Sequence, residues 1–338
     1  MKWTTVPVDI RRELADVISL LRATLDATPD DDSPDRAQLM ARLAFSLGWA
    51  ADADARPTAD AAIAVARRSA DPAALARALM YAGSTRDQFE TYDPDGFAGE
   101  INEVTSRLND PGLRCIALGG WLIGNVQRGR RAEADDTLDE LRALATKHHL
   151  LQPSFDTLKF TGQLALLDGD IDTADRIASE LLGHAARTDL PNLFLFASSL
   201  LYDVRLAQGR LAELLAWFQR RGDTRERIPR VAAMRAQVLA HAGHDDEATQ
   251  LLHQLTADGF AAISPPERPH SIATLADVAC RLVDRSIVDR SIFDRSITET
   301  LHAAMAPWSG LVVYDGTNGP LVPVDSFLAR LHDVSRTD

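Results

Sequence analysis

A glycine turn that recurs four times between helix-length segments constrains this chain more than any other feature. The turns begin at Gly129, Gly169, Gly209 and Gly243, so successive glycines lie 40, 40 and 34 positions apart (129 to 169, 169 to 209, 209 to 243). Glycine readily adopts the left-handed conformation that ends a helix, and a polar residue after it can cap the next one. A helix pair joined in this way cannot bury its apolar stripe alone. The repeat therefore predicts a stack of antiparallel helix pairs, an all-α solenoid.

The unit Leu151–Leu182 shows the motif most completely, with helices expected over Phe155–Asp168 and Asp172–Leu182. Five of its positions hold, in this order, a small residue, a glycine, an acidic residue, an apolar residue and a second small residue. They are Gly162, Gly169, Asp170, Ile171 and Ala174. At these offsets the unit resembles a tetratricopeptide repeat. The other units keep the turn and lose parts of the pattern. The resemblance implies a right-handed superhelix of antiparallel helix pairs.

A second resemblance covers residues 36–331 and is carried by four segments: Ala73–Leu79, Leu164–Asp170, Gln208–Leu214 and Leu301–Val313. They are similar to the helical-repeat region of bacterial signal-transduction ATPases of the STAND type and of LuxR-type regulators. In those proteins the region is a sensor or partner-binding scaffold beside a nucleotide-binding motor and an output domain. This chain has no Gly-x-x-x-x-Gly-Lys-Ser/Thr loop, and the residues after Val322 have room for one helix and a short tail. The resemblance thus implies the receptor region without its ATPase or DNA-binding domain.

Composition excludes several functions. The net charge is −13, from 36 basic and 49 acidic residues, and so argues against a nucleic-acid binder. Residues 1–7 lack the apolar core of a signal peptide, and no apolar run reaches the ~18 residues of a membrane span. We therefore expect a soluble, cytoplasmic protein without membrane contact. Cys115 and Cys280 are expected as buried thiols, and the histidines form no metal site. No metal and no cofactor are predicted.

The rest of the chain is predicted as one domain, 1–338. Further helices are expected over residues 8–27, 35–50, 58–69, 72–83, 97–108, 111–128, 131–148, 190–208, 226–242 and 325–334. Residues 84–96 form an irregular loop, either a connector or a functional lid. Residues 284–297 repeat Asp-Arg-Ser-Ile every five positions. They are predicted to form a partly helical surface insertion that has no catalytic role. Residues 309–338 form a C-terminal cap in which 310–314 is expected as a short strand.

Candidate ligand-binding residues lie on the helices before each glycine turn, which are richer in aromatic residues and are assigned to the concave side. Polar and aromatic side chains alternate there at helical spacing. They are Arg114, Trp121, Asn125, Asp156, Lys159, Gln163, Asn192, Phe196, Ser199, Asp203, Arg227 and Met234, and Arg77 and Tyr81 are candidates to join them from the N-terminal side. Either these stripes line a binding groove, or they are solvated faces and packing edges.

Lys159 stands out because lysine occurs at only three positions, 2, 147 and 159. Near an apolar wall its pKa would fall, which would make it a base or imine former. The alternative is an exposed amine paired with Asp156 or another carboxylate. Asp156 and Asp203 are the other catalytic candidates, as general acids or bases in a dry groove.

Three functions remain open. The favoured one is a helical-repeat protein that binds a peptide, a protein partner or a small metabolite in its groove, in a regulatory or pathway-auxiliary role. The alternative is an enzyme on a repurposed repeat scaffold, catalysing a cyclisation or hydrolysis in a biosynthetic pathway. The third is an orphan fragment of a regulator that needs domains from another chain. Fold does not decide among them, and the sequence does not predict an oligomeric state.

Overall fold

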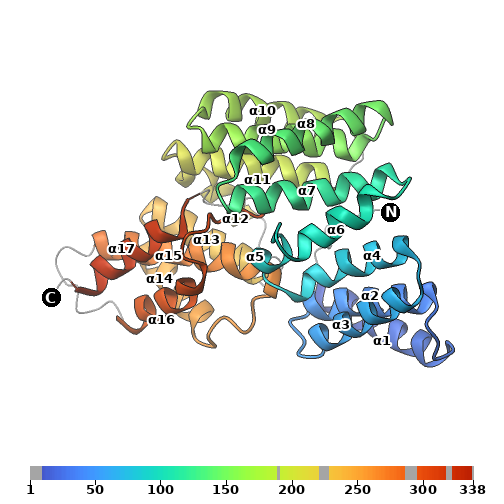
Figure 1. Cartoon of the computed structure of the whole chain (residues 1–338). Coiled ribbons are helices and arrows are strands. Elements are labelled where there is room, and N and C mark those ends of the chain that lie inside the picture. The colour runs from blue at the N-terminus through green and yellow to red at the C-terminus, as the bar shows by residue number, and fades with distance from the viewer. Residues whose placement is uncertain (1–9, 189–190, 221–227, 286–294, 317–321, 337–338) are drawn as a thin grey trace.

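The computed structural model describes residues 10–188, 191–220, 228–285, 295–316 and 322–336, and within these ranges the protein is all-α (Figure 1). The helices are α1 (Ile10–Asp26), α2 (Pro34–Trp49), α3 (Ala55–Arg68), α4 (Pro72–Ala82), η1 (Gly83–Thr85), α5 (Gln88–Thr91), α6 (Phe97–Ser106), α7 (Pro111–Gln127), α8 (Arg131–Lys147), α9 (Leu151–Leu167), α10 (Ile171–Ala185), α11 (Pro191–Ala207), η2 (Leu211–Leu214), α12 (Leu215–Arg220), α13 (Pro229–Ala242), α14 (Asp245–Thr256), η3 (Pro265–Glu267), α15 (Arg268–Arg285), α16 (Arg295–Met305), η5 (Ala306–Trp308) and α17 (Val324–Arg336). None of these helices combines the length and hydropathy that a membrane crossing requires.

The four predicted glycine turns are confirmed. Their glycines have φ of +68°, +76°, +68° and +82° at positions 129, 169, 209 and 243. After Gly169, the backbone N–H of Asp170 bonds the carbonyl of Ala165 at 2.8 Å, and the Asp170 carboxylate accepts from the N–H of Thr173 at 3.1 Å. Asp170 thus closes the end of α9 through its N–H and caps α10 through its carboxylate, because the left-handed Gly169 reverses the chain between the two helices.

Several helix boundaries differ from the prediction; α3, for example, begins at Ala55 rather than at position 58. Helix α9 begins at Leu151, four residues before the expected start, and α10 continues to Ala185. Pro153 lies in the first turn of α9, where its missing N–H has no helical partner to lose, so it does not delay the start.

Successive helices pack on one another from α7 to α11, and Figure 1 shows them stacked above α2–α4 and α13–α17. Small residues set the closest approach. A Cβ added at Gly162 on α9 would lie 2.7 Å from Leu200 Cδ2 on α11 and 3.0 Å from Ile177 Cγ2 on α10. Helices α13, α14 and α15 pack together in the same manner, around Ala236, which is fully buried.

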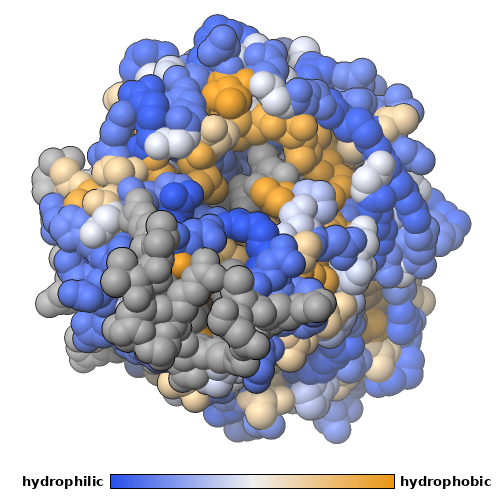
Figure 2. Space-filling model, turned by 90° about the vertical axis from the view of Figure 1, so that its left-hand side faces the viewer, coloured by the Kyte–Doolittle hydropathy of each residue, from blue (hydrophilic) through white to orange (hydrophobic). Residues whose placement is uncertain are grey.

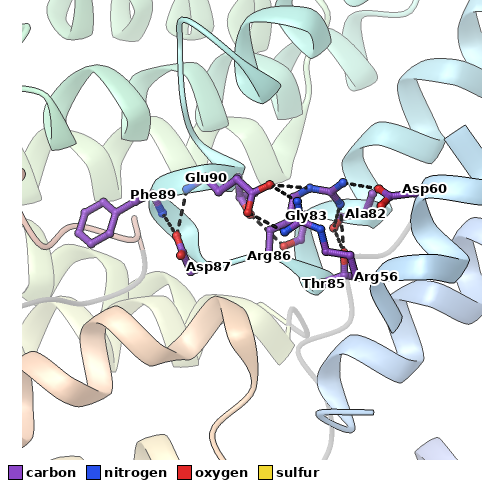
Figure 3. A network of polar contacts seen from close by, with 10 residues as sticks. Arg56, Asp60, Ala82, Gly83, Thr85, Arg86, Asp87, Phe89 and Glu90 are labelled. Atoms are coloured by element: carbon purple, nitrogen blue, oxygen red, sulfur yellow. Dashed lines mark hydrogen bonds and ion pairs between the residues drawn. The ribbon is translucent and has the colours of Figure 1, made fainter. Parts of the chain in front are cut away.

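The segment predicted as an irregular loop, 84–96, contains part of η1 and all of α5 (Figure 3). Arg86, whose side chain is 6% exposed, bonds Asp60 at 2.6 Å and Glu90 at 3.2 Å and stacks on the Phe97 ring at 4.6 Å. Phe89 belongs to the C-terminal core, and its ring centroid lies 5.5 Å from that of Trp308. The segment therefore ties the N-terminal helices to the C-terminal ones.

The expected strand at 310–314 does not form within the described residues. Only an isolated antiparallel bridge joins Val312 to Pro323. The bridge is made by the N–H of Val313 to the carbonyl of Val322 at 3.2 Å and the N–H of Val324 to the carbonyl of Leu311 at 2.8 Å, and α17 begins at Val324, so the pairing does not continue past it. The pentapeptide repeat of 284–297 falls mostly on residues 286–294, outside the described part; α15 runs to Arg285 before it and α16 begins at Arg295 after it.

Candidate functional site

The candidate site is built on one face of α9. Asp156, Lys159 and Gln163 follow one another at helical spacing, so their side chains leave the helix on the same side. Lys159 is only 5% exposed, and its Nζ lies 4.5 Å from the ring centroid of Phe160 and 4.3 Å from that of Phe196 on α11. The Asp156 carboxylate is 4.0 Å from Nζ. An ammonium between two aromatic rings is attracted by their faces.

The electrostatics of this pair are set by burial. Burial lowers the pKa of Lys159, and the charges of Asp156 and Asp315 oppose that shift. Burial raises the pKa of Asp156, against the effects of Lys159 and of a 3.3 Å hydrogen bond from Gln152. Each shift favours the uncharged form, because loss of water outweighs the attraction between the partners. The charged and the neutral forms of the pair are therefore closer in energy than they would be in water.

A segment from the far end of the chain lies against the same face. The backbone N–H of Val312 donates to the main-chain oxygen of Gln127 at 2.8 Å, and Gln127 Nε2 donates to the carbonyl of Tyr314 at 2.7 Å. The Tyr314 hydroxyl donates to Gln163 Oε1 at 3.0 Å. Asp315 forms a 2.6 Å ion pair with Arg230 of α13. The segment Val312–Gly316, hereafter the inner segment, thus connects α7, α9 and α13.

Two of the predicted residues on α11, Phe196 and Asp203, lie near the site. Phe196 contacts Lys159, while Ser199 and Asp203 are 5% and 4% exposed. The charge of Asp203 contributes, after burial and Asp315, to raising the pKa of Tyr314, which places Asp203 near the inner segment. The side chain of Asn192 and all of Arg227 lie outside the described residues.

Other predicted residues lie elsewhere. Arg114 and Trp121 line a separate depression of about 260 Å³ with residues of α6 and α8, and Arg114 is held there by Glu140 at 2.8 Å. Tyr81 lines another depression, of about 480 Å³, and its hydroxyl accepts from Arg42 at 3.3 Å. Arg77 is 3.9 Å from Asp110. Neither depression is lined by a residue of α9, so a single groove lined by all the stripes is not observed in the described part of the chain.

The two remaining candidates, Asn125 and Met234, lie on α7 and α13. Asn125 on α7 is 1% exposed. Met234 on α13 packs against the cluster around Tyr202, and its carbonyl lies 3.4 Å from the Tyr202 hydroxyl. Tyr202 also donates to Gln237 at 2.6 Å, and Gln237 donates to Asp277 at 2.9 Å. This chain of contacts holds α11, α13 and α15 together.

Sequence reasoning missed Gln127, Arg230, Tyr314 and Asp315. Only Arg230 had a detectable signal, since it lies on the same helix as the predicted Met234 and one turn before it. Two buried groups near Arg230 were also missed. Burial raises the pKa of Glu267, while burial and Arg230 lower that of His270 to about 3.

The face of the molecule shown in Figure 2 is hollowed, and hydrophobic residues gather around the hollow among hydrophilic ones. In the described part of the chain, no three His, Cys, Asp or Glu side chains are placed to hold a metal ion. Comparison of the chain with protein-family models found no match, and comparison with curated proteins found no significant one.

Proposed function

We propose that the chain is a tetratricopeptide-like superhelical repeat protein that binds a peptide, a protein partner or a small metabolite against the α9 face of Asp156, Lys159 and Gln163. In this arrangement the helices before each glycine turn, α7, α9, α11 and α13, line the inside. The proposal rests on Lys159, a charged side chain between two aromatic rings with a carboxylate 4.0 Å away. Burying two charges costs several kcal/mol per ion, so a face needed only for packing is better filled with apolar side chains.

The chemistry of the face limits what it can hold. Lys159 offers donors, Asp156 offers acceptors, and Phe160 and Phe196 offer ring surfaces. A ligand that carries both an acceptor and a donor beside an apolar part matches this set, as an amino-acid-like metabolite or a peptide segment does. The resemblance to sensor regions of signalling ATPases fits a regulatory or pathway-auxiliary role.

Native mass spectrometry after exposure to an extract of the source cells tests the proposal. The wild-type protein is expected to retain a small molecule or a polypeptide, and Lys159→Met to lose it. Lys147→Met is the matched control, because Lys147 is exposed at the C-terminal end of α8. Equal retention by wild type and Lys159→Met would remove the α9 face from the site.

A second function, catalysis, is favoured by one observation. Lys159 is buried with a lowered pKa, so a larger share of it is the free amine that attacks a carbonyl carbon and forms an imine with loss of water. Asp156, whose pKa is raised, would carry the proton for such a step. A retained molecule whose mass changes on incubation would support this reading. Loss of that change in Lys159→Met or Asp156→Asn, with binding kept, would assign the roles.

A further inference from the structure

The inner segment is held residue by residue. Val313 and Tyr314 are fully buried and Asp315 is 8% exposed, although the segment forms no helix. Gln127 contacts it at two backbone positions, through its own main-chain oxygen and through its side-chain amide. Hydrogen bonds to its main chain are one way in which an extended peptide is held.

Its side chains are recognised by polar partners on different helices. Gln163 of α9 accepts from the Tyr314 hydroxyl, and Arg230 of α13 pairs with Asp315, with side chains 14% and 6% exposed respectively. At Gly316, which has φ of +70°, an added Cβ would lie 2.6 Å from Ile123 Cδ1. The surface therefore selects an aromatic hydroxyl, then a carboxylate, then a glycine.

The inner segment also covers the candidate site. Tyr314 bonds Gln163, which lies one turn beyond Lys159 on the same face of α9. Tyr314 and Phe160 belong to one apolar cluster, and Phe160 is one of the two rings beside Lys159. Whatever binds this face of α9 must meet the inner segment or replace it.

We propose that the inner segment is an intramolecular ligand of a peptide-binding surface formed by α7, α9 and α13, and that the partner of this surface is an extended peptide with a Tyr-Asp-Gly sequence. The inference deepens the proposed function and rests on it, since it names the ligand class and the element that controls access. Gln127, Gln163 and Arg230 lie on the regular helices α7, α9 and α13, so we expect them to keep their positions when the inner segment leaves. A competing peptide would find the same donors and acceptors in the same positions.

The test uses the full chain and a fluorescent synthetic peptide with the sequence of residues 311–316, LVVYDG. In Tyr314→Ala/Asp315→Ala the inner segment loses its two anchors while the surface keeps its own residues. Fluorescence anisotropy is expected to show this variant binding the peptide at least about tenfold more tightly than wild type, because the competing internal segment lowers the apparent affinity of the wild-type surface. Adding Arg230→Met should abolish the gain, and a peptide with Phe and Asn in place of Tyr and Asp should bind weakly to every form.

Absence of peptide binding by the double variant, with its helical circular dichroism intact, would overturn the inference and make the inner segment permanent core. A second measurement covers a double variant that fails to fold. In the wild-type protein, hydrogen exchange at residues 312–316 should be faster than in α7 and α9, through an opening smaller than global unfolding. If residues 312–316, α7 and α9 all exchanged at one common rate, the inference would likewise be wrong. Neither readout depends on a ligand from the cell extract, so failure here is distinguishable from failure of the proposed function.

Discussion

The Lys159–Asp156 pair gives the sharpest test of the site, through a double-mutant cycle of Lys159→Met, Asp156→Asn and the combination. Two unit charges 4.0 Å apart interact by about 4 kcal/mol at an effective dielectric constant of about 20. Desolvation opposes this attraction with several kcal/mol per ion. The directions of both pKa shifts show that desolvation is the larger effect at each group.

Each single substitution removes the attraction and leaves the other charge buried without its partner. The double substitution removes both charges and therefore the desolvation cost of each. We therefore expect a coupling free energy of about 2–4 kcal/mol between the two sites. The double variant should be at least as stable as wild type. Urea unfolding at pH 7 measures this from the midpoints, provided that the m-values agree. A coupling below about 0.5 kcal/mol would refute the buried contact.

The pH dependence of stability gives an independent check. The pKa of Lys159 is lowered in the folded state, so between that value and the unfolded value of about 10.4 the unfolded chain binds more protons, and stability rises with pH. The pKa of Asp156 is raised, so stability falls as pH rises from about 3.9 through the folded value. Lys159→Met should lack the rise and Asp156→Asn the fall, while Lys147→Met should retain both.

Three other predictions concern the fold. Gly169→Ala should lower the free energy of unfolding in urea by about 1 kcal/mol, because its φ of +76° is strained for alanine although nothing lies within 4 Å of an added Cβ. Gly162→Ala should lower it by about 1–3 kcal/mol, because an added Cβ would crowd side chains of α10 and α11. Burial raises the pKa of the Cys115 and Cys280 thiols to about 11, so iodoacetamide at pH 8 should modify them only after unfolding, as mass spectrometry would show. Arg86→Met should lower stability by about 1–3 kcal/mol, since the Ala82 carbonyl and Thr85 hydroxyl lose a buried donor.

The repeat turns were predictable because their cause is local. A left-handed glycine with a capping residue after it is visible within six positions, as at Gly169, Asp170 and Thr173. The relation of Lys159 to Asp156 was predictable for the same reason, since both lie on one turn of one helix. The sequence left open whether that amine is exposed or buried. In the structure Lys159 is both buried and paired with Asp156.

The convergence of the site was not predictable. Helical spacing tells which residues share a face of their own helix, and says nothing of which faces meet. Arg114 and Trp121 therefore looked equivalent to Lys159 and lie instead at another depression. The inner segment is the extreme case, because Tyr314 is 151 positions from Gln163 and 187 from Gln127. Its apolar run indicates a strand, and only tertiary contact reveals a buried tyrosine with two polar partners.

The identity of the buried cation bears on what the site does. Of 36 basic residues only three are lysines, so arginine is the default cation of this chain. Arginine serves the ion pairs of Arg86 and Arg230, where a planar fork meets a carboxylate and a permanent charge is harmless because it is paired. A guanidinium between Phe160 and Phe196 would stay charged at every accessible pH, whereas a lysine there can lose its proton to a partner such as Asp156. Within the described residues, Lys159 is the buried lysine, and burial shifts both Lys159 and Asp156 toward their uncharged forms, which a packing residue does not require and a ligand-binding or catalytic residue can use.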